Sequence, residues 1–236
     1  FGKIFKTTDG GESWNQQVSN SGATFYSMKF VNENTGYATG DYNTIIKTTN
    51  GGLNWSSQSS GIPNSTQKLS SLFINSSDGQ SCWIAGFNGT ILKTSNGGND
   101  WIKNKYSVTT NYLWSSSFIN DNTGWAVGEF GTIIKTEDGG DTWELQSSNT
   151  FSTLIHVQFE NDNLGWVVGH EGIILKTTDS GDNWTMQNSG TYENLFDSYF
   201  IDSTTGWIAG DSGVIKTTNG GANWFFQLNE PWVYSV

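Results

Sequence analysis

One short motif recurs six times along the chain and restricts the possible folds more than any other feature. It runs from a Lys-Thr pair through Asp or Asn and one or two glycines to a tryptophan, as in Lys6–Trp14. The copies close at intervals of 40 to 46 residues, on Trp14, Trp55, Trp101, Trp143, Trp184 and Trp224. A fixed period of about this length is typical of solenoids, propellers and other arrays built from one supersecondary unit.

Two further landmarks keep step with this box. One is a Gly-aromatic-x-x-Gly segment, with Cys in place of the first Gly in one copy, at residues 36–40, 82–86, 124–128, 165–169 and 206–210. The other is a phenylalanine shortly before that segment, at Phe30, Phe73, Phe118, Phe159 and Phe200. Between the landmarks, apolar and polar residues alternate with the two-residue period of strands, and clusters of Gly, Asn, Asp and Ser bound each run. Each repeat therefore predicts four short strands.

Four strands per unit of about 40 residues predict an all-β fold, a β-propeller of four-stranded antiparallel blades. Complete units follow one another from Thr24 onward, whereas Gly2–Val18 supply only the last two strands of a unit and Pro231–Val236 resemble the start of a first strand. We therefore expect one domain over residues 1–236 with six blades, the closing blade using both termini and lacking its second strand. The alternative is an excerpt from a seven-bladed propeller, with further sequence outside this stretch.

The box residues suit a turn. Glycine permits positive φ at little steric cost, and Asp or Asn accepts backbone N–H bonds. Three copies carry Asp at this position and three carry Asn, namely Asp9, Asp138 and Asp179 against Asn50, Asn96 and Asn219. Because Asn carries no charge, we interpret this position as chosen for turn geometry. We expect the box tryptophans, and Trp83, Trp125, Trp166 and Trp207 one strand earlier, to pack in the core.

With these six boxes the chain resembles the Asp-box, or BNR-repeat, propellers, a group that includes sialidases, xyloglucan-degrading glycosidases and sortilin-type receptors. The fuller unit looks most like the photosystem II assembly/stability-factor-like repeat proteins. The resemblance covers nearly the whole chain and implies the propeller fold, whereas function depends on sites that vary among proteins of one fold. A sialidase would imply an arginine triad for the substrate carboxylate, and the photosystem factor is associated with an arginine-bearing basic patch. This chain contains eleven lysines and no arginine, which disfavours sialidase activity.

Charge and hydropathy exclude several classes of partner. The net charge is −11, so we expect no nucleic-acid partner, because phosphate binding requires clustered cations. The apolar runs are far shorter than the roughly 20 residues that span a bilayer, so we expect no membrane insertion. We also expect no cofactor and no metal: Asp138 with Asp141 and Asp179 with Asp182 lie on turns that can suit Ca²⁺, but the EF-hand spacing is absent.

The candidate ligand-binding residues follow the Gly-aromatic-x-x-Gly segments, where the repeat allows variation. They are Asp41, Phe87, Glu129, His170 and Asp211. In a propeller this turn faces the central funnel, where such side chains can contact a ligand, act as an acid/base pair at a separation of about 5–10 Å, or only solvate a turn. His156, on a predicted innermost strand, is interpreted as a satisfied structural histidine or a ligand contact. We assign no catalytic residue.

Low charge density, Ser/Asn/Thr/Gly-rich strands and the lack of a catalytic motif favour binding over catalysis. We expect a secreted binding or scaffold propeller for a protein or glycan partner, located outside the cell, on its surface or in the periplasm. One alternative is a carbohydrate-active enzyme, a glycosidase or lyase, or a fragment of one. Another is an assembly factor for a membrane protein complex.

Overall fold

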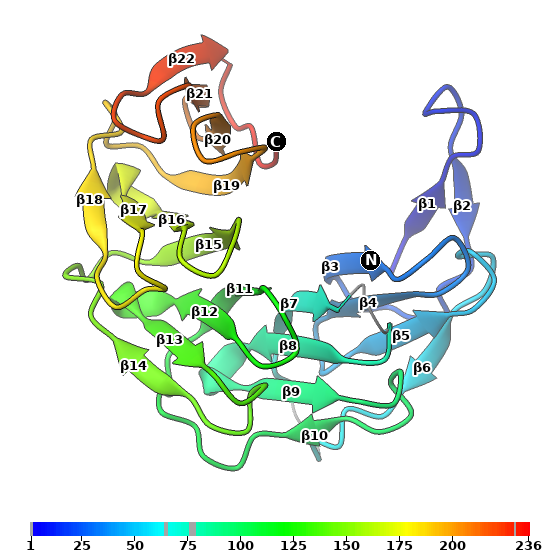
Figure 1. Cartoon of the computed structure of the whole chain (residues 1–236). Helices are drawn as coiled ribbons and strands as arrows, with labels where there is room; N and C mark the ends of the chain where they lie inside the picture. Colours follow the sequence, from blue (N-terminus) through cyan, green and yellow to red (C-terminus); the bar gives the residue numbers. More distant parts are fainter. Residues whose placement is uncertain (1, 64–65, 76–78, 229) are drawn as a thin grey trace. The chain divides into compact units, whose positions relative to one another are not determined.

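The computed structural model describes residues 2–63, 66–75, 79–228 and 230–236, which form six antiparallel sheets of consecutive strands (Figure 1). Five sheets have four strands and one has two. This arrangement confirms the predicted all-β propeller fold with four-stranded blades, one for each complete repeat. Within the described ranges, no helix has the length and apolarity needed to cross a membrane.

The first compact unit, Phe1–Ser107, contains three of the sheets. The two-stranded sheet pairs β1 (Ile4–Lys6) with β2 (Asn15–Gln17). The next sheet contains β3 (Phe25–Phe30), β4 (Gly36–Gly40), β5 (Ile45–Thr48) and β6 (Ser56–Gln58). The last contains β7 (Leu69–Ile74), β8 (Cys82–Gly86), β9 (Ile91–Thr94) and β10 (Ile102–Lys103).

The second compact unit, Val108–Val236, also contains three sheets. The first contains β11 (Leu113–Phe118), β12 (Gly124–Gly128), β13 (Ile133–Thr136) and β14 (Glu144–Gln146). The second contains β15 (Leu154–Phe159), β16 (Gly165–Gly169), β17 (Ile174–Thr177) and β18 (Thr185–Gln187). The third contains β19 (Leu195–Phe200), β20 (Gly206–Gly210), β21 (Gly213–Thr217) and β22 (Phe225–Leu228). The predicted landmarks fall where expected in every four-stranded sheet. The phenylalanine lies at or next to the end of the first strand, and the box joins the third strand to the fourth.

Side-chain hydrogen bonds hold the box turn in the way that the interchange of Asp and Asn predicts. In the fourth copy, Thr136 donates its hydroxyl to Asp138 at 2.9 Å and accepts the Gly140 N–H at 2.8 Å, while the Thr142 N–H donates to Asp138 at 2.8 Å. Asn50 takes the same place in the second copy and accepts the N–H of Asn54 at 3.0 Å. The turn needs a side-chain oxygen and not a charge, so the box is structural.

Aromatic rings explain why the landmarks keep a fixed spacing. Phe159 stacks on Trp125 of the preceding sheet, with ring centroids 3.5 Å apart, and meets its own box residue Trp184 edge-on at 5.9 Å. Phe200 repeats the arrangement, stacking at 3.7 Å on Trp166. A Cβ atom at Gly206 would lie 2.3 Å from the Phe200 ring, so the close approach of this ring accounts for the first glycine of the Gly-aromatic-x-x-Gly segment.

The predicted core positions of the tryptophans are confirmed with two departures. The last five box tryptophans are at most 9% exposed, and Trp83, Trp125 and Trp166 are almost fully buried. Trp14, however, is 60% exposed, because the two-stranded sheet contains no first-strand phenylalanine to cover it. Trp207 is only partly buried.

The segment after β22 forms no regular strand, although it contacts β19 in the manner of a first strand. Asp197 accepts hydrogen bonds from the Ser235 hydroxyl at 2.7 Å and from the Val236 N–H at 3.2 Å. Tyr234 stacks on Phe196 with ring centroids 5.3 Å apart. The start of a further repeat unit is therefore visible in the contacts of this segment.

Candidate functional site

The five turn residues singled out in the sequence each follow the second strand of a four-stranded sheet, as predicted. At every one of them the backbone N–H donates to the carbonyl group just before or at the start of the first strand, at 2.9 to 3.0 Å. The pairs are Asp41 to Thr24, Phe87 to Lys68, Glu129 to Tyr112, His170 to Thr153 and Asp211 to Asn194. Because this bond uses only the backbone, the fold leaves the side chain free to vary.

Three of these residues open a single 3₁₀ turn that sequence reasoning did not predict. The turns are η1 (Phe87–Gly89), η2 (Glu129–Gly131) and η3 (His170–Gly172). Their central residues have positive φ, at 55° for Asn88, 55° for Phe130 and 58° for Glu171. Non-glycine residues seldom adopt this conformation, and no side-chain period announces it.

The side chains at these turns bond within their own sheets. Asp41 accepts the Tyr26 hydroxyl at 2.8 Å, and burial together with this bond raises the pKa of Tyr26 to about 12. Asp211 accepts the Asn194 amide at 2.8 Å. Among the described residues of the second unit, no hydrogen bond or ion pair joins Glu129, His170 and Asp211 to one another. The role of these turn residues in ligand binding stays a prediction.

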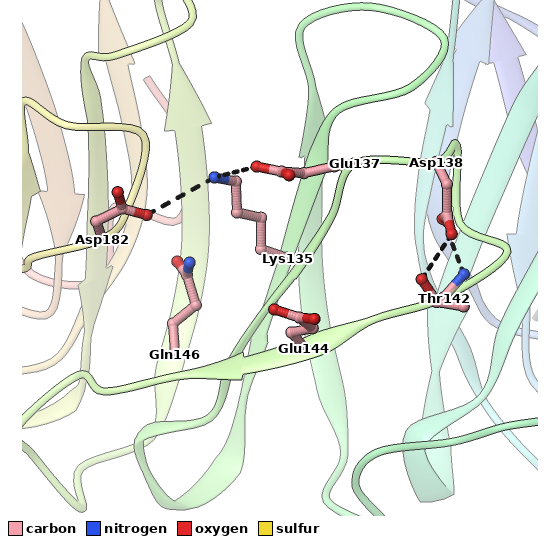
Figure 2. Close-up of a pocket in the computed structure, with 7 residues that line it drawn as sticks. All are labelled: Lys135, Glu137, Asp138, Thr142, Glu144, Gln146 and Asp182. Carbon is pink, nitrogen blue, oxygen red and sulfur yellow. Dashed lines mark hydrogen bonds and ion pairs between the residues drawn. The ribbon is translucent and has the colours of Figure 1, made fainter.

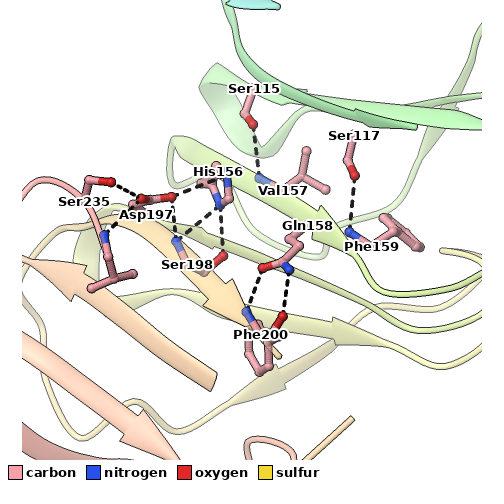
Figure 3. A network of polar contacts seen from close by, with 11 residues as sticks. Ser115, Ser117, His156, Val157, Gln158, Phe159, Asp197, Ser198, Phe200 and Ser235 are labelled. Atoms are coloured by element: carbon pink, nitrogen blue, oxygen red, sulfur yellow. Dashed lines mark hydrogen bonds and ion pairs between the residues drawn. The ribbon is translucent and has the colours of Figure 1, made fainter. Parts of the chain in front are cut away.

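The first strands of the second unit are tied together by polar side chains (Figure 3). Ser115 on β11 accepts the Val157 N–H of β15 at 3.3 Å. Gln158 on β15 holds both backbone groups of Phe200 on β19, accepting the N–H at 2.9 Å and donating to the carbonyl at 3.1 Å. These bonds link one sheet to the next without a continuous strand ladder.

His156 belongs to the same network and is a satisfied structural residue. Its Nδ1 lies 2.9 Å from the Ser198 hydroxyl and its Nε2 lies 3.4 Å from Asp197 Oδ1 (Figure 3). Ser, His and Asp are the residue types of a hydrolase triad, but the nucleophile of such a triad must reach a substrate. Ser198 is only 3% exposed, and Asp197 also accepts hydrogen bonds from two residues of the C-terminal segment. This trio joins β15 to β19, and its serine hydroxyl is buried away from any substrate.

An open acidic cleft lies in the second unit, and the sequence did not reveal it. Its volume is about 430 Å³, and its lining combines two successive boxes with strand β14. Figure 2 shows Lys135 with Glu137 on one side and Asp182 on the other, at 2.7 Å and 3.9 Å from its ammonium nitrogen. Asp138, Thr142, Glu144 and Gln146 complete the lining, which therefore holds four carboxylates and one ammonium group, with Glu137 and Asp182 beside the ammonium.

The charges of this cleft are held in place by the box. Partial burial acts to raise the pKa of Asp138, but the hydrogen bonds from Thr142 and Thr136 outweigh this effect and hold the pKa below its ordinary value. Lys135 is 10% exposed, whereas Glu137 and Asp182 are 73% and 71% exposed. The carboxylates of Glu137 and Asp182 thus reach into solvent, where they attract cations.

The position of Lys135 distinguishes this pair of sheets from the others. Lys47 and Lys176, at the same place in the repeat, donate to the carbonyl of the first box glycine of the next sheet, Gly97 at 2.6 Å and Gly220 at 2.7 Å. Ser180 replaces that glycine opposite Lys135, whose ammonium turns instead to the two carboxylates. Two departures from the repeat could have indicated the cleft in the sequence. Ser180 replaces the first box glycine, and Glu137 stands where the other boxes have Thr or Ser.

The described residues contain no group of three or more His, Cys, Asp or Glu side chains arranged to hold a metal ion. Asp138 and Asp179 act instead as acceptors for their own turns, Asp179 receiving the Asn183 N–H at 2.9 Å. Their carboxylates are therefore already engaged by the protein.

Comparison with protein families finds a match over most of the chain. A family model described as photosynthesis system II assembly factor YCF48 matches residues 12–111 and 104–191. The structure of YCF48 from Cyanidioschyzon merolae is 18% identical, with a TM-score of 0.72, covering 92% of this chain and 76% of that one. Among curated proteins, no sequence matches.

Two other solved structures bear on the alternatives. One described as YCF48 bound to D1 peptide is 18% identical, with a TM-score of 0.50, covering 87% of this chain and 81% of that one. An ancestral GH74 enzyme is 14% identical, with a TM-score of 0.73, covering 95% of this chain but 35% of that one. At these identities the likeness demonstrates a common fold and nothing more.

Proposed function

This chain belongs to the family of photosynthesis system II assembly factor YCF48, and on that premise we propose that it is an assembly factor that binds a segment of a subunit of a membrane protein complex. A relative in this family is described as bound to a D1 peptide, which supports a protein partner. The family match supports this alternative better than a free-standing secreted scaffold or a glycan-binding propeller. The GH74 likeness extends to only 35% of that enzyme and gives no comparable support to hydrolysis.

The observation that carries the proposal is the acidic cleft. The cleft has four carboxylates and one lysine in its lining, on a chain with net charge −11 and no arginine, and it therefore complements a cationic segment. Oppositely charged surfaces accelerate encounter and exclude wrongly charged partners. We therefore propose that the bound segment carries Lys or Arg side chains that enter the cleft beside Glu137, Glu144 and Asp182.

A peptide titration tests this assignment. We expect a labelled, flexible peptide with three lysines to bind, the same peptide with three glutamates not to bind, and the affinity to fall as salt is raised. The variant E137Q/E144Q/D182N should bind the lysine peptide about tenfold or more weakly, because each close charge pair contributes to affinity. Asp138 stays unchanged, since it holds the box turn.

The matched control removes three charges from exposed carboxylates outside the cleft, with E160Q/D162N/E193Q. It should bind as the wild type does. Equal weakening by both variants would show that only net charge matters, and unchanged binding by the cleft variant would reject the cleft. Cross-linking in the native host, followed by mass spectrometry, then identifies the subunit. Recovery of no membrane-complex subunit would reject the assembly role.

We also propose that the chain is a single propeller domain whose closing blade takes strands from both termini. The sheet β1–β2 has the landmarks of a third and fourth strand, and residues 231–236 contact β19 as a first strand does. Deleting residues 231–236 should then accelerate hydrogen exchange at Ile4–Lys6. Unchanged exchange there would reject the shared blade. A location outside the cytoplasm stays a prediction, which cell fractionation tests.

A further inference from the structure

Three aromatic side chains are exposed on turns and loops of the second unit. Phe130 lies at the centre of η2 and is 67% exposed. Phe151 and Tyr192 lie in the loops that lead into β15 and β19, and they are 90% and 93% exposed. Each of these loops connects two complete four-stranded sheets. The exposure of the rings therefore belongs to the loops themselves and not to a sheet that lacks strands.

The repeat does not require aromatic residues at these places. Phe151 and Tyr192 both lie three residues before a first strand, where the other complete sheets have Gly22, Thr66 and Thr110. At the position of Phe130, the other complete sheets have Tyr42, Asn88, Glu171 and Ser212. The same turns thus form with small or polar side chains, and the core does not use these rings.

Backbone contacts place η2 beside the loop that carries Phe151. The Gly131 N–H donates to the Ser152 carbonyl at 3.1 Å. A Cβ atom added at Gly131 would lie 2.0 Å from the carbonyl oxygen of Thr150. Thr150 and Ser152 flank Phe151 in the chain. Gly131 directly follows Phe130, so the two rings are carried by backbone segments in direct contact.

Glu171 joins the loop of Phe151 to the loop of Tyr192. The Ser152 hydroxyl donates to Glu171 Oε2 at 2.6 Å. The Glu171 N–H donates to the side-chain oxygen of Asn194, two residues after Tyr192, at 3.4 Å. This exposed carboxylate is therefore bonded to a close neighbour of each ring. We call this surface the aromatic row, and it consists of Phe130, Phe151, Glu171 and Tyr192.

The charge of the second unit selects the kind of partner. Residues 108–236 contain three lysines and 16 Asp or Glu residues, whereas residues 1–107 contain eight lysines and six Asp or Glu residues. The three lysines lie near the ends of third strands, at Lys135, Lys176 and Lys216, whereas η2 and Glu171 precede those strands. A cationic partner is therefore attracted to the aromatic row, and an anionic surface is repelled.

We propose that the aromatic row binds an arginine-bearing segment of another polypeptide, whose guanidinium groups stack on Phe151 and Tyr192 and pair with Glu171. A guanidinium is planar and more weakly hydrated than an ammonium group, so it stacks on an exposed ring at lower cost. While stacked, its N–H donors still reach a carboxylate at the edge of the ring. The 236 residues contain no arginine, so a second copy of them does not supply these groups.

This site is separate from the acidic cleft and does not depend on it. Among the described residues, the lining of the cleft contains no aromatic side chain. The cleft attracts lysine and arginine by charge alone, whereas stacking favours arginine. A preference for arginine over lysine therefore distinguishes the aromatic row from the cleft.

Peptide titrations with the cleft variant E137Q/E144Q/D182N test the proposal, because this protein retains the aromatic row. We expect a flexible Gly/Ser peptide with three arginines to bind at least about fivefold more tightly than the same peptide with three lysines. The peptide with three citrullines, which are planar but neutral, should bind more weakly than either. The arginine peptide should also shift the ring resonances of Phe151 and Tyr192. Equal affinities for the arginine and lysine peptides would overturn the proposal, whether or not the wild-type cleft binds lysine.

Loop variants locate the arginine peptide on the aromatic row. In the same background, F151S/Y192S should weaken its binding about tenfold, because both stacking contacts are lost. Glu171→Gln should weaken it as well, because the paired charge is lost. The matched control Y199S/F225S removes a 53% exposed tyrosine of β19 and a 64% exposed phenylalanine of β22, and it should bind normally. Full binding by F151S/Y192S, or equal loss in the control, would contradict the assignment.

Vesicle sedimentation separates this proposal from a lipid surface, which also accepts exposed aromatic rings. We expect the wild-type protein to stay in solution with vesicles of phosphatidylcholine alone and with vesicles that contain phosphatidylserine. Sedimentation that F151S/Y192S abolishes would overturn the proposal and assign the rings to a membrane surface.

Discussion

The first and fifth copies of the box carry nearly the same residues but end in different surroundings. In both, the threonine hydroxyl bonds to aspartate, at 2.7 Å for Thr7 and 2.8 Å for Thr177, and accepts the N–H of the last glycine at 2.8 Å. Yet Trp14 is 60% exposed and Trp184 is 5% exposed. The turn forms from local bonds, whereas burial of its tryptophan depends on strands supplied by other parts of the fold.

Truncating the two tryptophans tests this contrast most strongly. Trp184→Ala should lower the free energy of unfolding by about 3–5 kcal/mol, because it leaves a cavity against Phe159. Trp14→Ala should change it by only about 0.5 kcal/mol or less, as expected for an exposed side chain. Urea unfolding measures both values. A loss from Trp14→Ala as large as that from Trp184→Ala would show that Trp14 is packed in solution, and the contrast would fail.

The glycines that face the landmark phenylalanines offer a finer comparison. An added Cβ would lie 2.3 Å from the Phe200 ring at Gly206 and 2.7 Å from the Phe30 ring at Gly36. Phe200 is 4% exposed and stacked on Trp166, so its ring cannot move aside, whereas Phe30 is 45% exposed.

We expect Gly206→Ala to cost about 1–3 kcal/mol of unfolding free energy, the usual range for overpacking, and Gly36→Ala to cost less. Gly22→Ala is the control, because no atom lies within 4 Å of a Cβ added there. Thermal and urea unfolding give the order of the three. A larger loss at Gly36 than at Gly206 would mean that a neighbour fixes the Phe30 ring in solution, and the comparison would fail.

The strands and the box geometry were predictable because they depend on residues near one another in sequence. Alternation defines each strand, and the exchange of Asp138 for Asn50 identifies the box as a turn device. The same landmarks correctly placed the turn residues Asp41 and Glu129 after the second strands. Repetition of a pattern is visible in a single sequence, and these features repeat.

What could not be predicted depends on what lies beside each repeat. Trp14 reads as core in the sequence and is exposed, because its sheet lacks two strands among the described residues. The acidic cleft arises where Glu137 from one box meets Asp182 from the next, and the separation of these residues in sequence gives no sign that they share one lysine. Contacts between sheets, not within them, produced the candidate sites.

Acid titration gives the smallest expected effect and sharpens the claim that the box turn is local. The hydrogen bond from Asn183 is the main cause that lowers the pKa of Asp179, and the bond from Ser13 is the main cause for Asp9. A carboxyl group whose folded pKa is depressed stabilises the fold above its unfolded pKa, near 3.8 here, and loses that contribution as the pH falls toward the folded value.

Asp179→Asn keeps the oxygen that accepts the Asn183 N–H, as Asn219 does in the last box, but cannot titrate. We therefore expect the melting temperature of this variant to fall less steeply than that of the wild type below about pH 4. Asp9→Asn should flatten the dependence of melting temperature on pH in the same way despite the exposed Trp14, because the hydrogen bonds of its turn do not depend on how the tryptophan packs. If Asp179→Asn alone flattened this dependence, the two turns would differ in more than their neighbours.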